Sequence, residues 1–237
     1  MSRKTKKGAE AIVAVVDVHK KYKLGRNNFV HALRGTSLEI ETGDMTAVMG
    51  PSGSGKSTLM HIMGGLDKPD QGEVHVGGDR IDNLASKRLP RLRATRMGFI
   101  FQGFNLIPTL NALENVALTS EYKGVSRRES SKLAAEQLGA VGLGDRLKHR
   151  PSELSGGEQH RVAIARAFVN KPEIILGDEP TGDLDTETSA EIMSIMRERN
   201  ESTGTTFVLV THDPEIAAMC DRQIQMRDGV ITNTTQR

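Results

Sequence analysis

The chain has 237 residues, of which 37% are hydrophobic, so it can bury one sizeable core in a single domain over residues 1–237. Its 32 basic and 30 acidic residues leave a formal net charge of +2, and aromatic residues make up only 3%. This composition provides neither a strong positive field nor base-stacking platforms, so we expect no nucleic-acid partner. The single cysteine, Cys220, excludes an internal disulfide and is typical of a reducing compartment.

The first apolar run, residues 11–16, is much shorter than the roughly 18 residues of a membrane span and too short for a secretory leader. We therefore expect a cytoplasmic protein in which the basic residues 1–10 form a flexible tail. Beyond this tail, short apolar runs alternate with helical patterns, which is typical of an α/β fold. Strand patterns lie at residues 11–18, 45–50, 72–81, 97–102, 173–180 and 206–212.

Helices are expected from about Lys56 and over residues 186–200. Residues 111–142 read as helical throughout, and we place an inserted helical lobe at about 103–155. The last segment reads as a hairpin with its turn at Asp228-Gly229. We expect the hairpin elements near both ends of the chain to form an antiparallel sheet beside a parallel core.

A glycine-rich loop with the pattern G-x-x-x-x-G-K-[ST] stands between a predicted strand and a predicted helix, which is the context that a phosphate-binding loop requires. The loop consists of Gly50, Pro51, Ser52, Gly53, Ser54, Gly55, Lys56, Ser57 and Thr58. Its backbone N–H groups and the helix N-terminus favour phosphate, Lys56 reaches the β- and γ-phosphates, and the Ser57 hydroxyl is a ligand for Mg²⁺. The loop predicts a nucleotide site.

Polar residues follow three other predicted strands. Asp178, at the end of "IILGD", suits a Mg²⁺ partner, and Glu179 beside it could polarise an attacking water. Gln102 and His212 each end a strand pattern, so both should emerge on the rim of the phosphate loop if the sheet is parallel. Taken singly, the Asp-Glu pair and His212 could be helix caps and Gln102 a surface residue.

A second candidate phosphate site lies far downstream, where Ser155, Gly156 and Gly157 stand at the start of an apolar-rich helical segment. The free N–H groups at such an end bind anions. Ser155 could instead be only an N-cap, because Glu158 follows it at the capping-box spacing. If both places bind phosphate, the chain either holds two nucleotides or pairs head to tail with a copy of itself.

These segments resemble the motifs of ATP-binding-cassette (ABC) ATPases. "GPSGSGKST", "IFQ", "LSGGE", "IILGDEP", "GDLD" and "VTH" follow the order of the Walker A, Q-loop, signature, Walker B, D-loop and H-loop motifs. The resemblance implies a P-loop NTPase core with an antiparallel β subdomain and an inserted α-helical subdomain. It also implies that two cassettes pair head to tail, each capping the γ-phosphate of the other with Ser155, Gly156 and Gly157.

The resemblance further implies roles for single residues. Tyr22 would stack on adenine, although Phe29 is also nearby, and Gln102 would contact Mg²⁺ and couple the core to the helical lobe. Asp185 would act across the dimer, His212 would contact the γ-phosphate, and Glu179 would be the catalytic residue. The fifth signature residue is Glu158, where Gln is common in the family. We expect this departure to tune the cycle without loss of binding.

The stretches "MHIMGGLDKPDQGEV" and "GFIFQGFNLIPTLNALENVAL" resemble ATPases of the macrolide-export and lipoprotein-release type. That resemblance implies ATP and Mg²⁺ as cofactors, a second copy or related cassette as partner, and a separate permease with a large extracytoplasmic domain. The chain would sit on the inner face of the cell membrane, with the permease docked near "FNLIPTLNALENVAL". Alternatives are a regulatory cassette of the cell-division type and a soluble cassette of DNA repair or translation.

Overall fold

The computed structural model describes residues 11–25, 28–182 and 184–236; the expected basic tail at 1–10 lies outside these ranges. The strands are β1 Ala11–Lys23, β2 Phe29–Glu41, β3 Met45–Met49, β4 Gln71–Val76, β5 Asp79–Arg80, β6 Met97–Phe101, β7 Ile174–Asp178, β8 Thr206–Thr211, β9 Arg222–Arg227 and β10 Val230–Gln236. The helices are α1 Lys56–Met63, α2 Leu89–Arg96, α3 Ala112–Lys123, α4 Arg127–Ala140, α5 Gly156–Phe168, α6 Thr186–Thr203 and α7 Pro214–Ala218, with a 3₁₀ turn at Pro151–Glu153.

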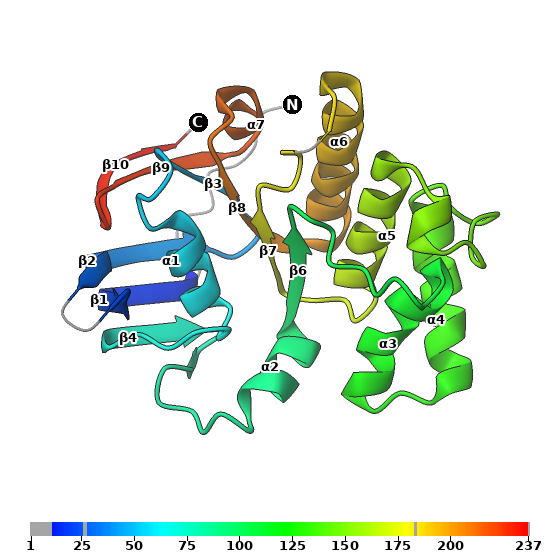
Figure 1. Ribbon diagram of the computed structural model, residues 1–237, viewed down its shortest axis with the longest axis horizontal. Coiled ribbons are helices and arrows are strands. Elements are labelled where there is room, and N and C mark those ends of the chain that lie inside the picture. Colours follow the sequence, from blue (N-terminus) through cyan, green and yellow to red (C-terminus); the bar gives the residue numbers. More distant parts are fainter. Residues whose placement is uncertain (1–10, 26–27, 183, 237) are drawn as a thin grey trace.

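The strands form two sheets (Figure 1). One is antiparallel with the order β2-β1-β4-β5, and the other has the order β10-β9-β3-β8-β7-β6. Strands β9, β3, β8, β7 and β6 run parallel to their neighbours, and only β10 is antiparallel in that sheet. In Figure 1 the antiparallel sheet lies on one side of α1, while α3, α4 and α5 gather at the opposite end of the molecule.

Side chains that alternate along the strands of the parallel sheet pack into two separate hydrophobic cores. Met45, Ala47 and Phe207 face a core shared with α3 to α7, whereas Val48 and Val208 face one shared with α1 and the antiparallel sheet. This alternation is the period of two that a strand imposes on its side chains. The parallel sheet is therefore covered on both faces, and its strands are apolar throughout, as parallel strands generally are.

One fold prediction is wrong. The C-terminal hairpin β9–β10 does not join the antiparallel sheet; β9 pairs in parallel with β3 and so extends the core sheet. The reason is the short helix α7, which follows β8 and returns the chain so that β9 runs in the same direction as β3. The predicted turn at Asp228-Gly229 is confirmed, since both residues have positive φ between β9 and β10.

Residues 111–142, which were expected to be helical, contain α3 and α4. Helix α3 starts after Asn111, whose side chain and that of Glu114 form a reciprocal capping box. Helix α4 ends at Ala140, and the fully buried Leu138 and Leu143 pack it into the helical core. In the part of the chain that the structure describes, no helix is both long and apolar enough to cross a membrane.

Candidate nucleotide-binding site

The register of the parallel sheet places the predicted polar residues on one rim. Met49 pairs with Thr211, and Asp178 pairs with both Phe101 and Val210. The residue that follows each of these strand ends therefore emerges at the carboxyl edge of the sheet. This edge is where open α/β sheets bind their ligands. The strand ends thus bring Gln102, Glu179 and His212 beside the glycine-rich loop.

The glycine-rich loop is held in a narrow turn by close packing. Gly50 and Gly55 have φ of 153° and 99°, and a β-carbon at either position would collide with the carbonyl of Met226 or Ala32, respectively. Gly53, at the top of the loop, has φ of 78° and open space in the direction of a β-carbon. Only glycine satisfies both the positive φ and these close approaches. The conformation of the loop is therefore fixed by its packing, and the space next to Gly53 is open.

Lys56 lies across this loop and contacts its backbone. Its Nζ donates to the carbonyl oxygens of Gly50 at 2.8 Å and of Pro51 at 3.1 Å. The side chain is almost fully buried, and its positive charge lies against backbone carbonyl dipoles at the N-terminus of helix α1. A phosphate placed on the loop would meet this ammonium group and the first N–H groups of α1 together.

Ser57 and Asp178, two of the three residues predicted to bind a metal ion with Gln102, contact each other. The Ser57 hydroxyl donates to the Asp178 carboxylate at 3.0 Å, and burial raises the pKa of Asp178. Among the described residues there is no cluster of three or more His, Cys, Asp or Glu side chains fit to hold a metal alone. A hydroxyl and one carboxylate suit Mg²⁺, which is commonly bound by one or two carboxylates together with substrate phosphates and water. The donor set therefore fits that ion.

Glu179 and His212 interact directly at the same edge. His212 Nδ1 lies 2.9 Å from Glu179 Oε1, and this hydrogen bond, with the charge of the carboxylate, raises the pKa of His212. Glu179 has φ of 46°, a left-handed conformation that is uncommon for a residue other than glycine. Its side chain is only 16% exposed, whereas that of His212 is 73% exposed. The pair presents one shielded carboxylate and one accessible imidazole.

Tyr22 lies on strand β1. Its hydroxyl donates to Asp67 at 2.8 Å, and burial followed by this hydrogen bond raises its pKa. Lys20 Nζ lies 5.2 Å from the centre of its ring and also donates to Asp67 at 2.8 Å. The ring is thus held at its edge and covered by a cation on one face. Phe29, the other aromatic candidate, is 53% exposed.

These residues surround one cavity of about 770 Å³, large enough for a nucleotide. Its walls are formed by Tyr22, Val30, Ala32, Pro51, Ser52, Gly53, Gly55, Lys56, Ser57, Thr58, Gln102, Glu179 and His212. Gly50, Ser54 and Asp178 are not among the lining residues, and Ser54 is buried. Val30 and Ala32 were not predicted, because they reach the cavity only through the pairing of β2 with β1, in which Val30 faces Tyr22.

The signature segment lies at a different place. Ser155 is the N-cap of α5: its Oγ accepts from the Glu158 N–H at 3.2 Å, and Glu158 Oε2 accepts from the Ser155 N–H at 2.8 Å. Asp185 caps α6 in a similar way through the N–H and hydroxyl of Thr188. Both caps line a hollow of about 360 Å³, formed by Ser155, Gly156, Gly157, Glu158, Arg161, Leu184, Asp185 and Thr188. Among the residues that the structure describes, none lines both this hollow and the 770 Å³ cavity within one chain.

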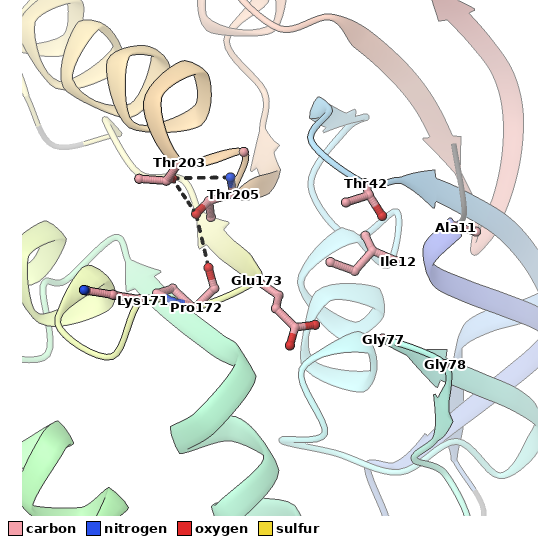
Figure 2. A pocket seen from close by; sticks show the side chains of 11 residues that line it. Ala11, Ile12, Thr42, Gly77, Gly78, Lys171, Pro172, Glu173, Thr203 and Thr205 are labelled. Atoms are coloured by element: carbon pink, nitrogen blue, oxygen red, sulfur yellow. Dashed lines mark hydrogen bonds between the residues drawn. The ribbon is translucent and has the colours of Figure 1, made fainter. Parts of the chain in front are cut away.

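Two further hollows differ in character. One has a volume of about 430 Å³ and is lined by the segments that precede β7 and β8, the start of β1 and the turn between β4 and β5. Figure 2 shows its lining residues. Its Thr203 and Thr205 hydroxyls bond to each other, and Thr205 also donates to the Pro172 carbonyl. The other, of about 490 Å³, is largely apolar and has the exposed side chains of Leu118 and Tyr122 on its wall. None of the predicted catalytic or binding residues lines either hollow.

A family model described as ABC transporter matches residues 33–182 of the chain. The chain belongs to the ABC transporter family. It is therefore an ATP-binding ATPase subunit, and the fold expected from the sequence motifs is confirmed.

The chain is 48% identical to an uncharacterized ABC transporter ATP-binding protein of Thermotoga maritima, covering 95% of this chain and 96% of that one. It is 46% identical to the lipoprotein-releasing system ATP-binding protein LolD of Alcanivorax borkumensis, over 90% of this chain and 92% of LolD. The macrolide export ATP-binding/permease protein MacB of Rhodopirellula baltica is 44% identical over 95% of this chain, which spans only 33% of MacB.

Among solved structures, the chain is similar to the ATP-binding cassette MJ0796. The structure of its dimeric post-hydrolysis state, bound to ADP and Pi, superposes with a TM-score of 0.88 at 43% identity. The match covers 94% of this chain and 98% of that one.

Proposed function

We propose that the chain powers a separate membrane permease of the export or lipoprotein-release type, through a head-to-tail dimer that forms around ATP. The observation that carries this proposal is the separation of the two anion sites, each lined by its own residues. A γ-phosphate on Lys56 of one copy would meet the α5 N-terminus of the other. ATP then stabilises the closed pair by contacts that ADP lacks.

In the hydrolytic step, Glu179 accepts a proton from a water molecule as the oxygen of that water bonds to the γ-phosphorus. The bond from this phosphorus to the β-bridging oxygen breaks, which leaves ADP and phosphate. His212 orients Glu179 through the 2.9 Å contact and donates toward the γ-phosphate. A Mg²⁺ ion held by Ser57, Asp178 and Gln102 would neutralise charge on the phosphates. Tyr22 stacks on the adenine ring.

Docking of a permease is supported by the apolar hollow of about 490 Å³. Leu66 and Leu118 are each 44% exposed and Tyr122 is 66% exposed on its wall, so a contiguous apolar surface faces outward there. The sequence 103–123, which we propose as the start of the helical subdomain 103–155, contributes part of this wall. A permease helix seated in the hollow would hold the chain at the inner face of the membrane.

The proposal is tested with Glu179→Gln, which retains the shape of the side chain and removes its ability to accept a proton. We expect this variant to accumulate as an ATP-bound dimer, seen as a doubling of mass by light scattering at saturating Mg-ATP. The matched control is Glu179→Gln with Gly156→Asp, since a β-carbon at Gly156 meets open space and the carboxylate would repel a γ-phosphate. A Glu179→Gln chain that binds ATP and stays monomeric contradicts the shared site.

A regulatory cassette that signals to a membrane partner without transport would have the same catalytic residues. The relatives named for macrolide export and lipoprotein release favour transport. Flux of substrate through the reconstituted complex distinguishes the two functions, because a regulatory cassette hydrolyses ATP with no movement of substrate.

A further inference from the structure

Glu158 places a carboxylate at the N-terminus of helix α5, where the proposed function requires a γ-phosphate from a second copy to bind. The Glu158 side chain is 28% exposed, and its Oε2 accepts from the Ser155 N–H at 2.8 Å. Two negative groups at one helix end repel each other, and the helix dipole favours only the first of them fully. An acidic capping box at this position therefore opposes the phosphate that the site has to accept.

Arg146 lies on the other side of the same carboxylate. Its Nε donates to Glu158 Oε1 at 3.1 Å, so the two oxygens of Glu158 are divided between the helix cap and this guanidinium. The cap hydrogen bond with Ser155 and the contact with Arg146 both lower the pKa of Glu158. The other charged groups at the 360 Å³ hollow are engaged elsewhere: Arg161 pairs with Glu191 at 2.7 Å, and Asp185 caps α6.

The backbone around Arg146 is anchored independently of Glu158. The Arg146 N–H donates to the Leu143 carbonyl at 3.1 Å, and the His149 N–H donates to the Arg146 carbonyl at 3.0 Å. Leu143 is fully buried in the helical core, and Leu147 packs against that core. The guanidinium is therefore presented by a fixed turn between α4 and α5.

We propose that Arg146 is a positioning residue for the ATP-bound dimer: its guanidinium neutralises the Glu158 carboxylate and holds it in the α5 cap, so that Ser155, Gly156 and Gly157 can receive a γ-phosphate. This rests on the proposed head-to-tail dimer. With a neutral residue at position 158, Arg146 would have no carboxylate charge to neutralise. The role of Arg146 is thus tied to the glutamate that occupies the fifth signature position.

The test is a double-mutant cycle in the Glu179→Gln background, with Arg146→Gln, Glu158→Gln and both together. The readout is the ATP-dependent dimer dissociation constant, measured by sedimentation equilibrium in Mg-ATP. The Arg146–Glu158 pair is partly exposed, and an ion pair of this kind changes an equilibrium by about threefold, so two sites per dimer give about tenfold weaker dimerisation for Arg146→Gln. We expect Arg146→Gln to have no effect once Glu158 is Gln.

Two further variants separate charge from structure. Arg146→Lys keeps the charge and should restore most of the dimerisation, and the loss in Arg146→Gln should shrink as salt is raised. Lys148→Gln removes an exposed charge from the same turn and should leave the dimer unchanged. ATP binding to the monomer, measured by equilibrium dialysis, should be equal in all variants, because the 770 Å³ cavity does not include Arg146.

An equal loss from Arg146→Gln with Glu and with Gln at position 158 would overturn the proposal and show a purely structural role. No loss in the Glu158 chain would overturn it as well. A Glu179→Gln parent that stays monomeric would instead overturn the proposed function, and this inference with it. If the Glu179→Gln parent dimerises as expected, a failed prediction for the Arg146 variants overturns only the proposal about Arg146.

Discussion

Glu179 combines an unusual backbone with a shielded side chain. The residue directly follows strand β7, its N–H donates to the Val210 carbonyl at 2.9 Å, and its φ of 46° is left-handed. Such a conformation costs on the order of 1–3 kcal/mol and persists only where the surrounding structure requires it. Here the turn aims the carboxylate at His212 and into the nucleotide cavity. The strained residue is the one proposed to act as catalytic base.

The contact between Glu179 and His212 predicts a shifted histidine titration. Since the carboxylate raises the pKa of His212, that pKa should lie above 6.5 in the parent chain and move down toward 6.5 in Glu179→Gln. NMR titration of the histidine ring signals in the nucleotide-free monomer measures both values. Equal pKa values in the two chains would contradict the contact.

The raised pKa of His212 also determines the direction in which this contact changes the stability of the fold with pH. A folded-state pKa above the unfolded value means that the contact stabilises the fold at pH below about 6.5 and is lost as pH rises through the folded pKa. Because the side chain of His212 is 73% exposed, solvent screens most of this contribution. The effect on function should therefore exceed the effect on stability.

At the scale of elements, one buried side chain organises the segment between β6 and α3. Asn115 is 2% exposed and its Oδ1 accepts from the Ile107 N–H at 2.7 Å. Its Nδ2 lies within 3.1 Å of the carbonyls of Ile107, Leu110 and Asn111. The segment leading into α3 thus receives from one amide the hydrogen bonds that regular structure would otherwise supply.

Asn115→Ala should therefore lower the free energy of unfolding by about 2 kcal/mol, because it leaves several backbone groups without partners. Urea unfolding followed by circular dichroism measures this loss. Lys123→Ala, at an exposed position of the same helix, is the control and should change the free energy by less than about 0.5 kcal/mol. Equal losses in the two variants would argue against the role of Asn115.

The individual helices and strands show which elements the sequence patterns could predict. Helix α3 was predicted because the sequence reads as helical from Asn111, and β7 because three apolar residues precede Gly177 and Asp178. Helix α2 went unrecognised, since only Leu89 and Ala94 are buried along its eight residues and its apolar periodicity is weak. The partner of β9 was predicted wrongly because strand pairing depends on contacts far apart in the chain.

At the scale of the whole molecule, the apolar hollow beside α3 lies apart from both anion sites. Replacing Leu118 and Tyr122 with Ser should weaken permease binding by at least about tenfold, since each side chain would bury apolar surface worth about 1 kcal/mol or more on docking. Copurification of the permease with the tagged chain in mild detergent measures this binding.

ATP hydrolysis by the free chain should not change in this double variant, because neither residue lines the nucleotide cavity. Val16→Ser, at an exposed apolar position in β1, is the control and should retain the permease. Retention of the permease by the Leu118 and Tyr122 variant would place the docking surface elsewhere.

The sequence by itself determined the local chemistry of this protein: the glycine-rich loop, the acidic pair after an apolar strand and the capped signature helix are each encoded by neighbouring residues. Only the tertiary structure decided that Tyr22, Gln102, Glu179 and His212 share one cavity, and that Ser155 lies outside it. It also placed Arg146 beside Glu158, twelve residues away along the chain. The reason is physical, since short-range patterns specify strands and caps, whereas sheet register and long-range packing decide which residues meet.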